Sequence, residues 1–227
     1  MESNQLSTGT LVISNMFIRI GGVPGVGKST LINNLVEVAN KNNLPVERVK
    51  GGDYLLKLAG VSSYDELRKL PEDYRASLRP EMYRLTYEED RRKPEIIKLR
   101  DAHFSLIDPE TSKIVIFPIL PEDAEQMVSM VLLTADPEVI MTRRTQQGDR
   151  IDRYFDLKTI KKEQAVEIEI ASSQAKDLGK ELVMVDNSPE WGASIYKEIV
   201  RRAFPEGRVR SFMKRALCVS IPFKERK

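Results

Sequence analysis

The chain has 227 residues, with 36 lysines and arginines against 34 aspartates and glutamates, a hydrophobic fraction of 41%, and a single histidine and cysteine. This length predicts one domain with insertions, the composition excludes a disordered chain, and the lone Cys218 excludes an internal disulfide or a cysteine-based zinc cluster. No apolar run approaches the roughly 18 residues of a membrane helix, and the N-terminal residues lack a secretory pattern. We therefore expect a cytoplasmic protein that does not contact membranes.

Apolar periodicity predicts strands and helices in alternation along the chain. Strands are expected at 16–20, 46–50, 95–101, 128–134 and 181–186. Helical spacing follows the first strand and recurs at about 62–92, 137–144, 159–178 and 191–203, with Pro71 and Pro80 punctuating the first of these. Residues 113–120 form an irregular apolar stretch interrupted by proline. This alternation predicts an α/β fold of three layers around a five-stranded parallel sheet.

The sequence GVPGVGKST at 22–30 lies between the first predicted strand and the helix after it. It matches the phosphate-binding pattern G-x-x-x-x-G-K-[ST], in which glycines let backbone N–H groups curl around a polyphosphate and the helix N-terminus adds a favourable dipole. Lys28 would reach the β- and γ-phosphates, and the Ser29 hydroxyl would hold Mg²⁺. The predicted nucleotide contacts are Gly22, Gly25, Val26, Gly27, Lys28, Ser29 and Thr30.

Arginines in two groups indicate what the nucleotide is used for. The sequence lacks the N-K-x-D guanine motif of GTPases and the acidic strand end of motor ATPases. Arginine binds phosphate through a planar fork, and phosphoryl transfer between two anions needs positive charge on both sides. For the first group, solvated helix faces paired with nearby acids explain the pattern equally well; for the second we favour a functional role. The first group is Arg68, Arg75, Arg79 and Arg84, and the second is Arg143, Arg144, Arg150 and Arg153.

Several segments in a fixed order resemble the archaeal type of adenylate kinase, over roughly residues 16–203. They are GVPGVGKST, GGDYLLKLAG, YDELRKLP, the Asp-Ala-His of RDAHFS, TADPEVIMTRR and VDNSPE. The resemblance implies a single P-loop kinase domain over 1–203, with a helical acceptor-binding insertion at about 53–92 and a short lid at about 144–155. It also implies ATP with Mg²⁺ as the donor, AMP as the acceptor, two ADP as the products, and a homotrimer.

The resemblance also implies roles for individual residues. Acceptor binding falls to Asp53, Arg68, Asp101 and His103. Contacts to ATP beyond the P-loop fall to Arg143 and Asn187, and a metal site to Ser29 with Asp101. Catalytic charge falls to Lys28, Arg144, Arg150 and Arg153. His103 is expected to serve as a structural or acceptor-site hydrogen-bonding residue, and Asp101 either to order a magnesium-bound water or to cap a helix.

Two features leave alternatives open. Lys98 and Arg100 interrupt the third strand, and residues 104–121 depart from the family pattern in the region that shapes the acceptor pocket. A kinase for another small acceptor, and a nucleotide-gated RNA- or ribosome-associated ATPase that retains the kinase fold, are therefore the alternatives to an ATP:AMP kinase.

The net charge of +2 conceals a basic C-terminal end. Residues 201–227 hold nine basic and two acidic side chains, a charge of +7, which leaves −5 on residues 1–200. We treat 204–227 as a basic extension and favour its packing on the acidic body or on a neighbouring subunit. Binding of RNA through phosphate contacts and aromatic stacking is the alternative.

Overall fold

The computed structural model describes residues 16–108, 111–146, 156–188, 192–204, 207 and 210. Its central sheet has the order β2-β3-β1-β6-β7, and every neighbouring pair of strands is parallel. This confirms the predicted five-stranded parallel sheet. The strands are β1 (Phe17–Gly21), β2 (Val46–Lys50), β3 (Ile97–Asp101), β6 (Met127–Thr134) and β7 (Leu182–Asp186).

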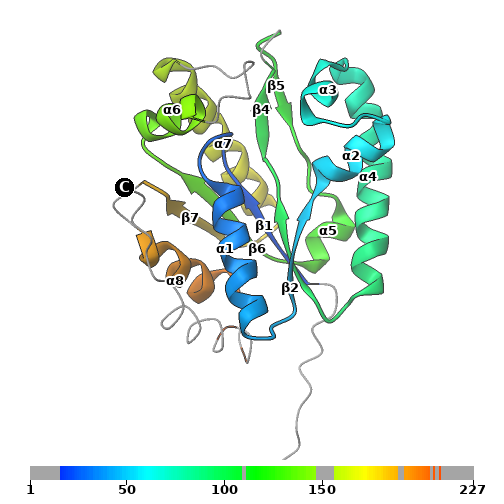
Figure 1. Cartoon of the computed structure of the whole chain (residues 1–227), viewed down its shortest axis with the longest axis vertical. Helices are drawn as coiled ribbons and strands as arrows, with labels where there is room; N and C mark the ends of the chain where they lie inside the picture. The colour runs from blue at the N-terminus through cyan, green and yellow to red at the C-terminus, as the bar shows by residue number, and fades with distance from the viewer. Residues whose placement is uncertain are drawn as a thin grey trace, which may run out of the picture.

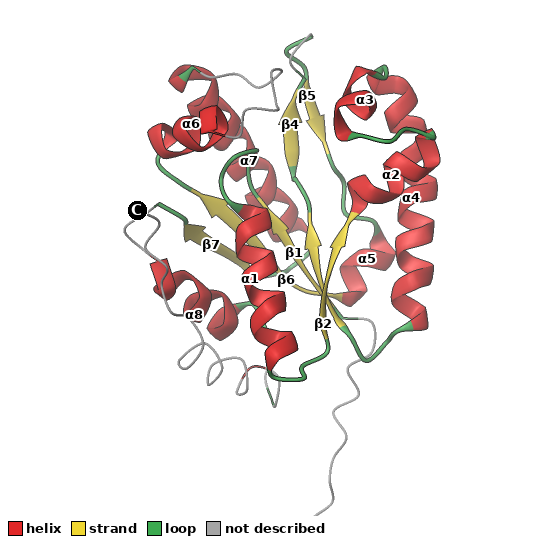
Figure 2. Ribbon diagram, in the orientation of Figure 1, coloured by secondary structure: helices red, strands yellow, loops and turns green. Residues whose placement is uncertain are grey.

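Helices cover both faces of this sheet and complete the three predicted layers. Helices α1 (Lys28–Lys41) and α8 (Gly192–Arg202) lie in front of the strands in the view of Figures 1 and 2, and α7 (Leu157–Asp177) lies behind them. The larger apolar cluster joins α1 and α8 to the sheet, and a second cluster joins α7 to β6. Helix α6 (Pro137–Gln146) begins at Pro137, as the sequence predicts.

The segment between β2 and β3 is helical, but it is divided into three helices. These are α2 (Gly51–Ala59), α3 (Tyr64–Lys69) and α4 (Glu72–Arg92). Pro71 precedes α4, whereas Pro80 lies inside it and does not end it. Proline in a helix interior removes one backbone hydrogen bond, and α4 can continue through it because the helix packs along α2 (Figure 2).

A small hairpin was missed in the sequence, where residues 113–120 read as irregular. Strands β4 (Ser105–Ile107) and β5 (Ile114–Ile116) pair antiparallel, and the short helix α5 (Pro121–Gln126) follows. The hairpin stands between α6 and α7 on one side and α2 and α3 on the other (Figure 1). Strands of three residues lack the alternation of apolar and polar residues over 4–8 positions that identifies a strand.

The charged residues of β3 have partners inside the fold. The Lys98 side chain is fully buried and its Nζ lies 2.7 Å from Glu47 Oε1. Arg100 pairs with Asp90 at 2.5 Å and with Asp123 at 2.6 Å. Lys98 is therefore part of a buried ion pair, while Arg100 also reaches the cavity described below.

The apolar core extends one residue beyond the predicted domain end at 203. Phe204 is fully buried in the larger cluster. The rest of the predicted basic extension, including Cys218, lies outside the described residues apart from positions 207 and 210. Within the described part of the chain, no helix is long and apolar enough to cross a membrane.

Candidate active site

The phosphate-binding loop joins β1 to α1 at the carboxyl ends of the parallel strands. Gly22, Gly25 and Gly27 have φ values of 135°, 83° and 99°, a region of backbone conformation that glycine adopts at little cost. The Lys28 ammonium group donates to the Gly22 carbonyl and, at 3.2 Å, to the Val23 carbonyl. The loop thus presents its backbone and one lysine at the sheet position where ligands of α/β proteins bind.

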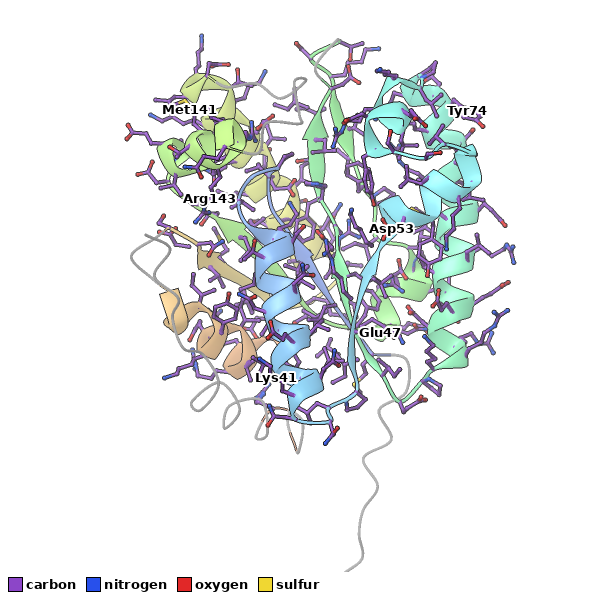
Figure 3. All side chains as sticks on the ribbon, viewed as in Figure 1. Lys41, Glu47, Asp53, Tyr74, Met141 and Arg143 are labelled. Atoms are coloured by element: carbon purple, nitrogen blue, oxygen red, sulfur yellow. The ribbon has the colours of Figure 1, made fainter. Side chains whose placement is uncertain are left out.

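Arg143 and Asn187, both expected near ATP, meet on one side of this loop. The Asn187 side-chain amide donates to the Val26 carbonyl at 2.7 Å, and Arg143 donates to Val26 and Asn187 carbonyls at 3.0 and 2.8 Å. A Cβ atom on Gly27 would lie 2.3 Å from Asn187 Nδ2, so glycine is required for this contact. Figure 3 shows Arg143 where α6 approaches the loop, and burial lowers the pKa of its guanidinium.

Arg144, expected among the catalytic residues, contacts the loop from the next position of α6. Its side chain is 1% exposed, donates to the Pro24 carbonyl at 2.9 Å and pairs with Glu163 at 2.5 Å. Successive helical residues point about 100° apart, and the two side chains reach the loop at different carbonyls, Arg143 at Val26 and Arg144 at Pro24. Arg144 is therefore placed to hold the loop.

Ser29 and Asp101 come together at the metal position that the sequence predicts. The Ser29 hydroxyl donates to Asp101 Oδ2 at 3.2 Å, and Arg48, which sequence reasoning missed, donates to both side chains. Hydroxyl and carboxylate oxygens suit Mg²⁺, which is commonly held by one or two protein oxygens, substrate phosphates and water. Ser29 and Asp101 fit that ion. The described residues contain no cluster of three His, Cys, Asp or Glu side chains, and a magnesium site that is completed by substrate phosphates and water needs none.

A cavity of about 250 Å³ opens beside this pair, between the sheet edge, α2 and α4. Apolar groups such as Leu55, Met82 and Phe117 form part of its wall, together with Asp101 and His103 from the segment after β3. Four arginines give it a strongly cationic lining. They are Arg19, Arg75, Arg79 and Arg100.

Two predicted acceptor residues lie outside this lining. Helix α2 turns Gly51, Gly52 and Leu55 toward the cavity, so Asp53 points away, as helical periodicity requires. Its carboxylate accepts from the Tyr64 hydroxyl, and Figure 3 shows it on the α2 side of the molecule. Arg68 pairs with Asp65 at 2.6 Å on α3. The structure therefore does not bring these two side chains to the cavity with Asp101 and His103.

Among the four cavity arginines, Arg19 is the one that sequence reasoning did not single out. It is 6% exposed, its Nη2 donates to the His103 carbonyl at 2.8 Å, and its Nε has no hydrogen-bond partner among the described atoms. Burial lowers the pKa of its guanidinium. An arginine inside the apolar run MFIRI is the signal that could have identified it, because a buried cation needs a partner or a ligand.

Comparisons with known proteins show which family this chain belongs to. A family model described as an AAA domain matches residues 21–161, which is more than half of the chain. The adenylate kinase of Sulfurisphaera tokodaii is 30% identical over 138 residues, covering 58% of this chain and 69% of that protein. The adenylate kinase of Methanopyrus kandleri is 31% identical over 139 residues, covering 60% and 69%. The chain belongs to the archaeal adenylate kinase family.

This adenylate kinase family member also resembles a solved shikimate kinase from Bacteroides thetaiotaomicron. That likeness has 16% identity and a TM-score of 0.45, and covers 82% of this chain and 95% of the other. The fold is defined by the strand order β2-β3-β1-β6-β7 with parallel pairing throughout.

The chain is thus a P-loop nucleoside monophosphate kinase, an enzyme that transfers a phosphoryl group from a nucleotide. Asp101 lies between Ser29 of the phosphate-binding loop and the arginine-lined cavity. The remaining predicted catalytic residues, Arg150 and Arg153, and the lid from residue 147 onward lie outside the described residues.

Proposed function

We propose that this kinase transfers the γ-phosphoryl group of Mg-ATP to AMP, giving two ADP. The observation that carries the proposal is the position of Asp101, which accepts from Ser29 of the phosphate-binding loop and also lines the arginine-rich cavity. One carboxylate therefore lies between the proposed donor site and the proposed acceptor site. The two sites are adjacent, as direct transfer from donor to acceptor requires. The likeness to enzymes named adenylate kinase supports ATP and AMP as the two substrates.

The proposed mechanism needs no covalent intermediate. Lys28 and Mg²⁺ held by Ser29 and Asp101 would neutralise the β- and γ-phosphates. Arg79 and Arg75 line the cavity from α4 and are held by Glu72 at 2.5 and 2.9 Å, so they are placed to bind the acceptor phosphate. An acceptor phosphate oxygen is already anionic and attacks without a general base. Arg150 and Arg153 of the lid would add charge on the transferring group and exclude water.

Other family expectations remain part of this proposal. His103 would hydrogen-bond the acceptor. The domain is proposed to run from residue 1 to about 204, with α2 to α4 as the acceptor-binding insertion and 144–155 as the lid. A homotrimer is proposed from the resemblance alone.

The test is incubation of the protein and Mg-ATP with AMP, GMP, CMP or UMP, followed by separation of the products. We expect diphosphate formation to be fastest with AMP. Preference for another monophosphate would overturn AMP as the acceptor, and ADP formation without acceptor phosphorylation would support the slow ATPase alternative.

Lys28→Ala should reduce phosphoryl transfer by at least about 100-fold, because it removes a charge that acts on the transferring group. Lys41→Ala is the matched control. Lys41 ends the same helix, is exposed and pairs with Glu37 (Figure 3), so transfer should be unchanged. Equal rates for the two variants would contradict the role of Lys28.

A further inference from the structure

Glu167 of α7 is a buried carboxylate that the proposed mechanism does not use. It is 1% exposed. Its Oε1 accepts from the Gly22 N–H at 3.1 Å and the Phe104 N–H at 2.9 Å. Its Oε2 accepts from the Ser105 N–H at 2.5 Å and the Ser105 hydroxyl at 2.7 Å. Each oxygen thus serves two donors, and hydrogen bonds from N–H groups to a charged acceptor are the stronger kind.

These four donors come from two different parts of the site. Gly22 begins the phosphate-binding loop, where its carbonyl accepts from the Lys28 ammonium group. Phe104 and Ser105 directly follow His103, which lines the acceptor cavity and whose Nδ1 lies 4.0 Å from Glu167 Oε1. One side chain of α7 therefore joins the donor loop to the acceptor wall.

A second contact brings the same two parts together without Glu167. The Phe104 ring lies so close to Gly21 that a Cβ atom there would be 2.2 Å from Phe104 Cε2. The ring is fully buried and belongs to the cluster that α7 shares with β6. Close-packed groups transmit small displacements to their neighbours instead of absorbing them. A movement of Gly21, which precedes the phosphate-binding loop, would therefore displace residues 104–105.

We propose that Glu167 is a positioning residue that couples the ATP site to the acceptor site. When Lys28 turns from the Gly22 carbonyl to a phosphate, Gly22 changes its hydrogen bonding. Glu167 carries that change to Phe104 and Ser105, and so to His103. ATP binding would then tighten acceptor binding, and by thermodynamic reciprocity the acceptor would tighten ATP binding by the same factor. The inference rests on the proposed function for the identity of the two ligands.

Glu167→Gln tests the coupling because the amide supplies one acceptor oxygen instead of two. With its NH₂ group toward Gly22 and Phe104, the variant loses both of those N–H contacts. In the other orientation it loses the contact to the Ser105 N–H, while the Ser105 hydroxyl can turn to accept from the amide. In both orientations it loses the negative charge that strengthens the remaining hydrogen bonds. We would measure the affinity for AMP with and without a non-transferable ATP analogue, the affinity for that analogue with and without AMP, and kcat. In the unmodified protein we expect each ligand to tighten the other by about 10-fold. In the variant that factor should fall to about one and kcat should fall about 10- to 100-fold, while affinity for the analogue alone changes less than about 3-fold.

Glu169→Gln is the matched control, since Glu169 lies two residues further along α7 and is exposed. It should leave both kcat and the coupling factor unchanged. If Glu167→Gln fails to fold, Ser105→Ala removes only the hydroxyl donor and should lower the coupling factor in part.

The inference is overturned if Glu167→Gln retains the coupling factor, even if both separate affinities fall, because that result describes a merely structural residue. Unchanged coupling in Ser105→Ala, where the glutamine variant does not fold, overturns it equally. Absence of coupling in the unmodified protein overturns this inference alone when AMP is still phosphorylated. Failure to phosphorylate AMP overturns the proposed function instead, and the same measurements then use the monophosphate that is phosphorylated.

Discussion

Cavity arginines show how neighbouring side chains decide the role of a residue. Arg79 and Arg84 lie on the same helix, but only Arg84 has glutamates three residues before it and four residues after it. Arg79 reaches the cavity, with its guanidinium 5.0 Å from the Phe117 ring centre. Arg84 is exposed and is held between Glu81 and Glu88. Only the first is therefore placed to meet a substrate.

Arg79→Ala should raise KM for AMP by about 10-fold or more, because a charge-assisted hydrogen bond to phosphate contributes about 1.5–3 kcal/mol. KM for ATP should change little. Steady-state kinetics with each substrate varied in turn measures both values. Arg84→Ala should leave both unchanged, and a similar rise in KM for AMP in the two variants would contradict the placement of Arg79.

Lys98 illustrates the cost of burying a charge. Its side chain is fully buried and its partner, Glu47, is 31% exposed. Glu47→Gln should lower the free energy of unfolding by about 3 kcal/mol, because it removes the negative charge that neutralises a buried cation. Lys98→Met combined with Glu47→Gln should restore most of that loss. Urea denaturation of the single and double variants measures both effects, and additive losses would argue against the pair.

At the scale of elements, α7 both packs against the core and positions side chains at the candidate active site. It spans 21 residues and contacts β4, β6, β7 and α6. It brings Glu167 to the phosphate-binding loop and Glu163 to Arg144, which itself donates to the loop. Its first turn is capped by Asp156, whose side chain accepts from the Thr159 N–H at 2.8 Å. The cap therefore fixes the start of the helix that positions both glutamates.

The Asp156 cap predicts a pH-dependent contribution to stability. The hydrogen bond from Thr159 lowers the pKa of the Asp156 carboxyl. Stabilisation by the cap should thus be complete above about pH 4, the unfolded value, and should be lost as pH falls through the lower folded pKa. Asp156→Ala should lower the urea midpoint at pH 7, and the difference from the unmodified protein should disappear in acid.

Asp177→Ala is the control for that experiment, because Asp177 ends the same helix. A carboxylate near a helix C-terminus is unfavourable to the dipole, so its removal should not lower the midpoint. A pH-independent difference for Asp156→Ala would contradict the capping explanation.

At the scale of the whole molecule, residues that follow α8 complete the core. The Ser129 hydroxyl of β6 donates to the Ala203 carbonyl at 2.8 Å, and Phe204 is fully buried beside it in sequence. The segment after α8 is therefore attached to β6, the strand that neighbours β1 in the sheet.

Phe204→Ala should lower the free energy of unfolding by about 3–4 kcal/mol, because it leaves a cavity in the core. Urea denaturation followed by circular dichroism measures the change. Tyr74→Ala is the control, since Tyr74 is 45% exposed on α4 (Figure 3) and should change stability little. A small effect for Phe204→Ala would mean that the domain ends before this residue.

The sequence by itself determined the parts of this protein that depend on neighbouring residues in the chain. Gly22, Gly27, Lys28 and Ser29 act through local backbone geometry, so their spacing predicted the phosphate-binding loop. Strands β1 and β6 were predictable for a similar reason, because they are buried and mostly apolar along their length. Strands β2 and β3 carry charged residues and were predictable from their alternation with helical segments.

Only the tertiary structure decided which charged side chains face the site. Arg19 and Arg79 reach the cavity while Arg68 does not, and Glu167 joins two segments that lie far apart in the sequence. Side-chain direction depends on which face of each element is packed and on partners from other elements. Those long-range contacts are set by the folded arrangement as a whole, so a pattern of charges along the chain could not reveal them.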